Sequence, residues 1–143
     1  MTIEAGVVLD LEGNPLHWHL PDGRSAGGLP DSRTLWDVIW ENRANISGIA
    51  HSHPGFGVPG PSYEDVTTFH AIEKGLGRLL NWWIISGDQH VLLRFAGPDK
   101  YTYKPVNGFL TKPQIDIIHA WQHTLRQHSG FSVNEENVGG GRS

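Results

Sequence analysis

Residues 48–65 read GIAHSHPGFGVPGPSYED, a stretch that passes from a strand-like pattern through a tight loop to the start of a helix. Because side chains alternate along an extended segment, His51 and His53 would share one face of a strand. The run PGFGVPGP can continue neither a strand nor a helix, and Ser62 then caps a helix that carries Asp65 in its first turn. Two imidazoles and a carboxylate brought together by such a loop predict a three-ligand zinc site with an open fourth position.

Length and composition restrict the classes of protein to which the chain can belong. Its 143 residues suit a single domain with a sizeable core. The net charge of -4, from 11 basic and 15 acidic residues without a basic run, argues against nucleic acid as a partner. The absence of cysteine excludes disulfides, thiolate zinc ligands and a cysteine nucleophile.

The sequence also indicates where the protein works. The first residues, MTIEAGVVLD, lack the basic and apolar segments of a signal peptide. No run approaches the roughly 18 apolar residues that are needed to span a membrane. We therefore expect a soluble, cytoplasmic protein with no membrane partner, and the sequence does not indicate an oligomeric state.

Residues 3–20 are predicted to form a β-hairpin, with turn residues at positions 12–15. The returning strand alternates apolar residues with His17 and His19. We expect Leu16, Trp18 and Leu20 to face the core and the two histidines to face water. No carboxylate or third histidine follows these histidines at a ligand-like spacing, so they are not predicted to bind a metal.

The rest of the chain is predicted to add helices and strands to this hairpin. Helices are expected near residues 31–42, 62–77 and 113–127, and strands near residues 46–53, 80–86, 89–95 and 101–103. In the strand of residues 46–53, Ile46 and Ala50 would face away from Ile49, His51 and His53. We expect one α/β domain, residues 1–128, with a mixed and largely antiparallel sheet flanked by helices. Residues 129–143, which are polar and glycine-rich, are expected to form a mobile tail.

The residue types of the central stretch suit hydrolysis at a zinc ion. Neutral imidazoles and one carboxylate leave the ion enough Lewis acidity to lower the pKa of a bound water toward about 7. A nearby glutamate could take the proton of that water and pass it to a leaving amine. A hydroxyl group such as that of Ser62 could donate a hydrogen bond to the oxyanion that develops on an attacked carbonyl.

The motif His51-Ser52-His53-Pro54, followed by a loop and Ser62-Tyr63-Glu64-Asp65, resembles the signature of the JAMM (MPN-plus, or JAB) family of zinc metallopeptidases. That signature is a distant glutamate, then H-x-H-P, a loop and S-x-x-D. The resemblance covers roughly residues 3–95 and implies a JAB/MPN-like, cytidine-deaminase-like fold of the free-standing prokaryotic or phage type. The loop between His53 and Asp65 is one residue longer than is usual in that family.

The resemblance also implies roles for individual residues. His51, His53 and Asp65 would bind one zinc ion, with water as the fourth ligand, and Ser62 would steady the oxyanion. Glu4 would be the general acid and base, because its segment EAGVVLD is similar to the family's E-x-x-G-L-x-x-G. Val7 stands where that family often has glycine. Glu12, in the predicted turn, is the alternative base.

The substrate class is likewise implied by the resemblance. It points to hydrolysis of a peptide or isopeptide bond at the flexible C-terminal tail of a ubiquitin-like or sulfur-carrier protein. Such a tail could add as a strand beside the catalytic groove. The alternatives are a non-catalytic scaffold on the same fold, a phage tail-assembly protein, and a purely structural zinc closed by His17 or His19.

Simpler interpretations of the same residues also exist. Ser62 and Asp65 could form only a helix-capping box, and a weak one, because aspartate is shorter than the usual Glu or Gln. His119 and His123 are four apart on a predicted helix, but Ala120 stands where a zincin H-E-x-x-H motif carries its glutamate. We expect these two histidines to form an exposed face.

Overall fold

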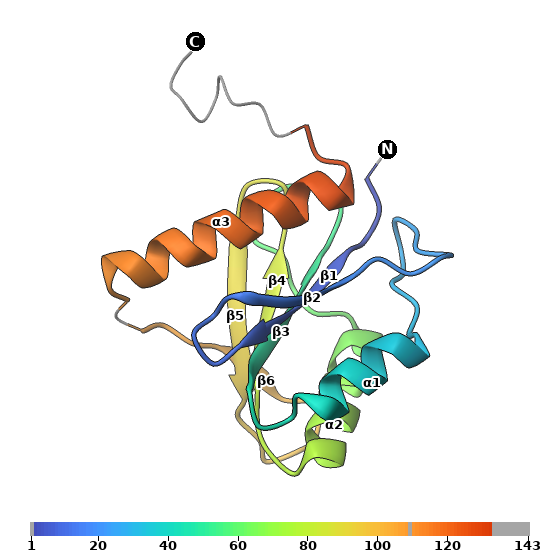
Figure 1. Ribbon diagram of the computed structural model, residues 1–143, viewed down its shortest axis with the longest axis vertical. Coiled ribbons are helices and arrows are strands. Elements are labelled where there is room, and N and C mark those ends of the chain that lie inside the picture. The colour runs from blue at the N-terminus through green and yellow to red at the C-terminus, as the bar shows by residue number, and fades with distance from the viewer. Residues whose placement is uncertain (1, 109, 133–143) are drawn as a thin grey trace.

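The elements of the fold follow one another in the order that the sequence predicts. The computed structural model describes residues 2–108 and 110–132 and is a mixed α/β domain (Figure 1). Its elements are β1 (Gly6–Asp10), β2 (Pro15–His19), α1 (Arg33–Glu41), β3 (Ile46–Ser52), α2 (Tyr63–Leu76), β4 (Asn81–Ile85), β5 (His90–Phe95), β6 (Tyr103–Pro105) and α3 (Lys112–Ser129).

The strands form one six-stranded sheet in the order β2-β1-β3-β4-β5-β6. The β3–β4 pair is parallel, and the other neighbouring pairs are antiparallel. Parallel strands need a long crossover, which α2 supplies between β3 and β4. The predicted mixed, largely antiparallel sheet is therefore confirmed, and the histidine motif lies at the end of β3, inside the sheet order.

Helices cover both faces of this sheet, α1 and α2 on one side and α3 on the other (Figure 1). Trp82 belongs to the α1/α2 side, where its ring stacks on that of Phe69 at 4.2 Å. Its neighbour Trp83 belongs to the α3 side and contacts the ring of Trp121 at 5.4 Å. The two tryptophans therefore pack in the core on opposite sides of the sheet.

A β-bulge corrects the face predicted for Ile46. Leu9 pairs with Gly48, but Asp10 pairs with Ile46, so β3 has one extra residue at this point. Because an extra residue inverts the alternation of side chains, Ile46 packs on the α1/α2 side together with Ile49 and not with Ala50.

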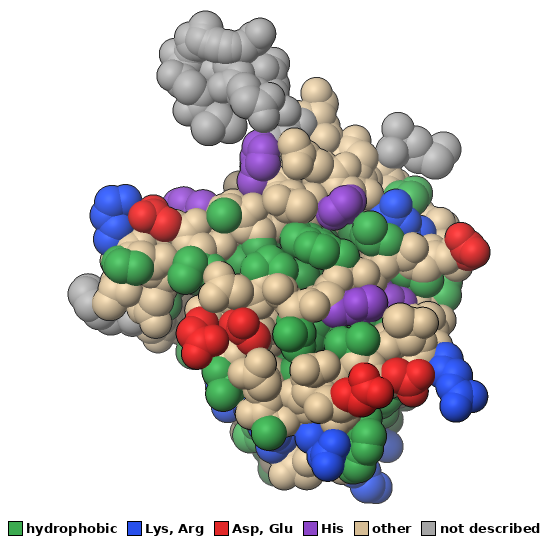
Figure 2. All heavy atoms as spheres, viewed as in Figure 1, with side chains coloured by type: hydrophobic (Ala, Val, Ile, Leu, Met, Phe, Trp, Pro, Cys, Tyr) green, Lys and Arg blue, Asp and Glu red, His purple; other side chains and the backbone are tan. Residues whose placement is uncertain are grey.

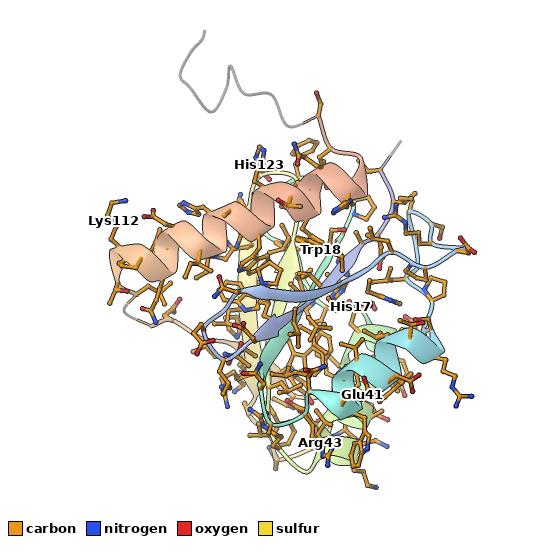
Figure 3. The ribbon with its side chains drawn as sticks, in the orientation of Figure 1. His17, Trp18, Glu41, Arg43, Lys112 and His123 are labelled. Atoms are coloured by element: carbon orange, nitrogen blue, oxygen red, sulfur yellow. The ribbon has the colours of Figure 1, made fainter. Side chains whose placement is uncertain are left out.

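The β2 strand departs from its predicted pattern for the same reason. A register shift between Val8 and Leu9 turns Leu16 to the α1/α2 side, whereas Trp18 and Leu20 pack on the α3 side. Figure 2 shows hydrophobic side chains gathered on this face of the molecule between α3 and α1. In Figure 3, Trp18 lies on the α3 side of β2 and His17 on the α1 side.

His19 contradicts the expectation that both β2 histidines face water. Its side chain is buried, with 5% of the residue exposed, and its Nε2 lies 2.7 Å from the carbonyl oxygen of Pro30. The burial of the ring lowers the pKa of His19, although the bond to Pro30 opposes that change. The ring thus fastens the loop that follows β2 onto the sheet.

A second correction concerns the end of the domain. The helix α3 continues through Ser129, which is fully buried and hydrogen-bonded, so Ser129 belongs to the folded domain and not to a tail. Phe131 also contacts the domain, through a ring pair with Phe56 at 5.7 Å. The rest of the predicted tail, residues 133–143, lies outside the described residues. None of the described helices is long and apolar enough to cross a membrane.

One charged residue of α2 lies inside the core. Glu73, which is 5% exposed, accepts hydrogen bonds from Leu80 N at 2.8 Å, Trp82 Nε1 at 2.9 Å and the Tyr103 hydroxyl at 2.5 Å. Burial and this carboxylate raise the pKa of Tyr103. A buried carboxylate must be matched by hydrogen-bond donors. Because these donors lie in or next to β4 and β6, the bonds join α2 to both strands.

Candidate metal centre

The end of β3 and the start of α2 bring the two halves of the predicted motif together. His51 lies in β3 opposite Gly6 of β1 on one side and Ile84 of β4 on the other. A glycine is required at position 48 of this strand, because a Cβ there would lie 2.3 Å from the carbonyl oxygen of Asn81. The central strand therefore holds His51 between two neighbours before the chain turns at Pro54.

The side chains of His51, His53 and Asp65 meet at one point. The two Nε2 atoms lie 2.9 Å apart, His51 Nε2 lies 3.2 Å from Asp65 Oδ1, and His53 Nε2 lies 3.0 Å from Asp65 Oδ2. Ligands at about 2.0–2.1 Å from a tetrahedral zinc ion are separated by about 3.3 Å. Two imidazole nitrogens and a carboxylate at these separations fit such an ion, with small outward movements of each atom.

Asp65 is held in place by the helix that it begins. Its Oδ2 accepts from Ser62 N at 2.8 Å, and its own N–H donates to Ser62 Oγ at 3.0 Å. This is a complete capping box, in which the short aspartate side chain reaches the backbone N–H of Ser62. Burial favours a higher pKa for Asp65, but bonds to His51, His53 and Ser62 N hold the pKa well below its ordinary value.

The Ser62 side chain therefore has a structural role beside the predicted catalytic one. Accepting from Asp65 N leaves the hydroxyl hydrogen of Ser62 able to donate a second bond. Ser62 also lines the cavity that the candidate metal ligands line. Ser62 therefore lies at the candidate site, which is where an oxyanion donor would have to lie.

Glu4 lies on the other side of the two histidines. It is buried, and one of its carboxylate oxygens lies within 4.8 Å of ring nitrogens of His51 and His53. Burial raises the pKa of Glu4, whereas the charges of both histidines lower it and that of Asp65 raises it. The alternative base, Glu12, is exposed in the β1–β2 turn, where its N–H donates to Asp10 Oδ1 at 2.9 Å.

The backbone of Glu4 is held by residues that the sequence did not single out. Glu4 N donates to the carbonyl oxygen of Ser25 at 2.9 Å. The Arg24 guanidinium donates to the carbonyl oxygens of Glu4, at 3.4 Å, and His128, at 3.0 Å. The loop after β2 and the end of α3 thereby fix the start of the first strand beside the histidines.

A buried pair of serines holds the residues on either side of Glu4. Ser52 Oγ accepts from Ala5 N at 2.9 Å and lies 2.8 Å from Ser129 Oγ. Ser129 Oγ donates in turn to the carbonyl oxygen of Ile3, and its own carbonyl accepts from Ile3 N at 2.9 Å. In the sequence, the only indication of this hydrogen-bonding role was the small polar side chain of Ser52 between the two histidines.

The loop that joins the two halves of the motif is fastened to the β4–β5 turn. Gly57 N donates to Asp88 Oδ1 at 2.8 Å, Ser86 Oγ donates to Gly57 O at 2.7 Å, and Gly87 N donates to Gly55 O at 2.8 Å. These bonds lie in a segment that turn composition alone describes only as a loop. They restrain the chain between His53 and Asp65.

The candidate metal ligands line a cavity of about 560 Å³. Its lining includes all five residues that the sequence predicts for the site: Glu4, His51, His53, Ser62 and Asp65. The volume falls within the range of about 300–1,000 Å³ that is usual for small-molecule and active sites. A reacting group could therefore enter beside the ligands.

No other cluster of this kind is found in the part of the chain that the structure describes. There, ligand atoms of Glu4, His51 and His53 all lie within 4.8 Å of one another, and Asp65 lies 3.0–3.2 Å from the same two histidines. His19 lines the same cavity, but its Nε2 is directed to Pro30 O. His119 is exposed on α3, as expected, whereas His123 is half-buried.

Comparison with models of known protein families finds no match to this chain, and comparison with curated proteins finds none either. The assignment of a function therefore depends on the geometry of the site and on the sequence motif.

Proposed function

We propose that the protein is a zinc-dependent metallopeptidase of the JAMM type with a JAB/MPN-like fold. The observation that carries the proposal is the convergence of His51 Nε2, His53 Nε2 and the Asp65 carboxylate at 2.9–3.2 Å, with Glu4 beside them. The order of elements supports it too, since the H-x-H-P motif ends a central strand and the S-x-x-D motif begins the next helix.

One zinc ion per chain would be held by His51, His53 and Asp65. When bound, zinc supplies Lewis acidity, which polarises a carbonyl and lowers the pKa of water toward about 7. A fourth, open position facing the cavity is what distinguishes a catalytic zinc site from a structural one. The direction of the His19 ring toward Pro30 supports an open site over one that is closed by that histidine.

Glu4 and Ser62 would carry out the proton transfer and charge stabilisation. Glu4 would take a proton from the attacking water and give it to the departing amine, and burial raises the pKa of its carboxyl group. Ser62 Oγ would donate a hydrogen bond to the oxygen that becomes negative on the attacked carbonyl. Both groups line the same cavity as the ligands.

The proposed substrate is a protein with a flexible C-terminal tail, of the ubiquitin-like or sulfur-carrier class. The strand β2 supports this, because it forms an edge of the sheet and its last residue, His19, lines the cavity. An extended tail could pair with that free edge and bring its scissile bond to the site.

The test is to measure bound metal and hydrolysis together. Purified protein should contain about one zinc per chain by elemental analysis, and should cleave a panel of ubiquitin-like fusions in a reaction that a chelator stops and zinc restores. His51→Ala should abolish both metal binding and cleavage, whereas the matched His119→Ala, on the exposed face of α3, should leave both intact.

Two results would overturn the proposal. The first is a wild-type protein that binds no zinc, because the proposed metal centre would then not exist. A protein that binds zinc and cleaves no member of the panel would instead be the non-catalytic scaffold or tail-assembly protein on the same fold.

A further inference from the structure

The cavity at the metal centre has a second, apolar end. Away from the ligands its lining includes apolar side chains from the sheet and the two helices on that face: the partly buried Ile49 and the buried Val8, Leu35, Phe69, Ile72 and Trp82. These residues come from β1, α1, β3, α2 and β4, so the apolar end reaches into the space between the sheet and the helices. Leu29, in the loop after β2, also lines it.

The apolar end begins directly at the ligands. The ring of Phe69 lies 6.2 Å from that of His51 and stacks on Trp82 at 4.2 Å. A group bonded to an amide at the ligands would therefore lie beside the wall that Phe69 forms. Burying such a group would stabilise the bound substrate by about 25 cal/mol for each Å² of apolar area removed from water.

The charges around the cavity restrict what can enter. Its described lining includes the carboxylates of Glu4, Asp31, Glu64 and Asp65 and includes no Lys or Arg. A free substrate carboxylate next to the scissile bond would be repelled by those groups and would meet no cationic side chain in that lining. A neutral apolar group would meet no such penalty.

We propose that the apolar end of the cavity is a specificity pocket for a bulky aliphatic or aromatic side chain on a residue that flanks the scissile amide. The preferred substrate would then be an internal amide or isopeptide bond next to a Leu-like or Phe-like residue, with no free carboxylate beside it. This inference rests on the proposed hydrolase function and names the substrate class of the same site.

The first experiment measures specificity. Zinc-loaded protein is given matched peptides in which the residue on either side of the scissile bond is Gly, Leu, Phe or Glu. We expect kcat/KM for Leu or Phe on one side to exceed that for Gly at least tenfold, because each buried methylene contributes about 1–3 kcal/mol of discrimination. Glu should be the poorest. Equal values for Gly, Leu and Phe on both sides would overturn the inference.

The second experiment fills the pocket with a larger side chain and compares that variant with a matched control. Thr67 and Thr68 are both exposed, but only Thr68, which directly precedes Phe69, lines the cavity. Thr68→Trp should lower kcat/KM for the preferred peptide at least tenfold and that for the Gly peptide less than threefold. Thr67→Trp should change neither. An equal loss with both peptides in Thr68→Trp would contradict a specificity pocket.

A binding measurement separates this inference from the hydrolase proposal. Benzyl alcohol titrated into the metal-free protein should shift the NMR signals of the Ile72 and Leu35 methyl groups, and Thr68→Trp should suppress those shifts. If the shifts appear but no peptide is cleaved, the pocket exists and the hydrolase proposal fails. If cleavage occurs without the shifts, the hydrolase proposal stands and the pocket is excluded.

Discussion

Two buried glutamates, Glu73 and Glu4, show how the same side chain is used for two purposes in one small domain. Glu73 accepts bonds from Leu80 N, Trp82 Nε1 and the Tyr103 hydroxyl, so donors surround its carboxylate. Glu4 faces a cavity, and the groups nearest to its charge are those of His51, His53 and Asp65.

The difference indicates which carboxylate is available for chemistry. Donors that match a buried charge stabilise it and fix its position, which makes Glu73 a link between α2, β4 and β6. A carboxylate that burial has made more basic, and that lies beside potential metal ligands, is suited to proton transfer. The same substitution, Glu to Gln, should therefore lower activity at position 4 and stability at position 73.

The largest expected effect is that of Glu4→Gln on activity. We expect kcat/KM to fall by about 10²–10⁴, the usual contribution of a general acid or base, because the amide cannot take the proton. Zinc content should remain at the wild-type level by elemental analysis. Retention of most of the activity would show that Glu4 is not the base, although the metal centre would still stand.

Glu73→Gln should act on stability and not on chemistry. An amide matches only some of the donors around this position, and bonds to a charged partner contribute about 1.5–3 kcal/mol each. We expect the free energy of unfolding in urea to fall by about 2–3 kcal/mol, while kcat/KM per folded molecule at low temperature stays unchanged. An activity loss comparable to that of Glu4→Gln would end the distinction between the two glutamates.

Ser129→Ala should have a smaller effect on both quantities. It removes the hydroxyl that bonds the carbonyl oxygen of Ile3 and the hydroxyl of Ser52. Ser52 in turn accepts from Ala5 N, so both neighbours of Glu4 lose support. We expect a loss of about 1–2 kcal/mol in urea unfolding and a fall of a fewfold in kcat/KM, since a displaced base transfers protons less well. The matched Ser132→Ala, at an exposed position, should change neither; an equal effect of both variants would contradict the role of Ser129.

The smallest expected effect is a pH dependence of stability from His19. Its folded pKa is lowered, chiefly by burial, so the unfolded state binds a proton more readily than the folded state does. The stability of the wild type should therefore decrease as the pH falls below about 6.5, the ordinary histidine value. Unfolding curves of His19→Gln should show a weaker decrease over that range; an identical decrease would place its origin elsewhere.

Sequence patterns predicted most of the fold, because the elements are local and carry clear end signals. Ser62 and Gly77 delimit α2, and Ser32 caps α1, as side-chain oxygens before a helix and glycine after it indicate. The turn residues near Gly13 likewise placed the β1–β2 hairpin. These features depend on neighbours in the sequence, so they can be recognised from the sequence alone.

The errors arose where distant residues decide the outcome. The burial of His19 depends on Pro30, and that of Ser129 depends on Ile3 and Ser52, so no local pattern indicated them. The face of Ile46 depends on a bulge in the pairing with β1. A motif of known spacing placed His51, His53 and Asp65, but the residues that hold Glu4 beside them became visible only in three dimensions.

The capping box at Ser62 and Asp65 has a consequence for how the centre would be filled. Because helix formation already positions Asp65, and β3 positions His51, the ligands are arranged by folding and not by an ion. The protein would therefore fold first and acquire its metal afterwards, unlike a zinc finger, which needs the ion to fold. Such a centre could be emptied and refilled, so cobalt could replace zinc and report on the ligands through its visible spectrum.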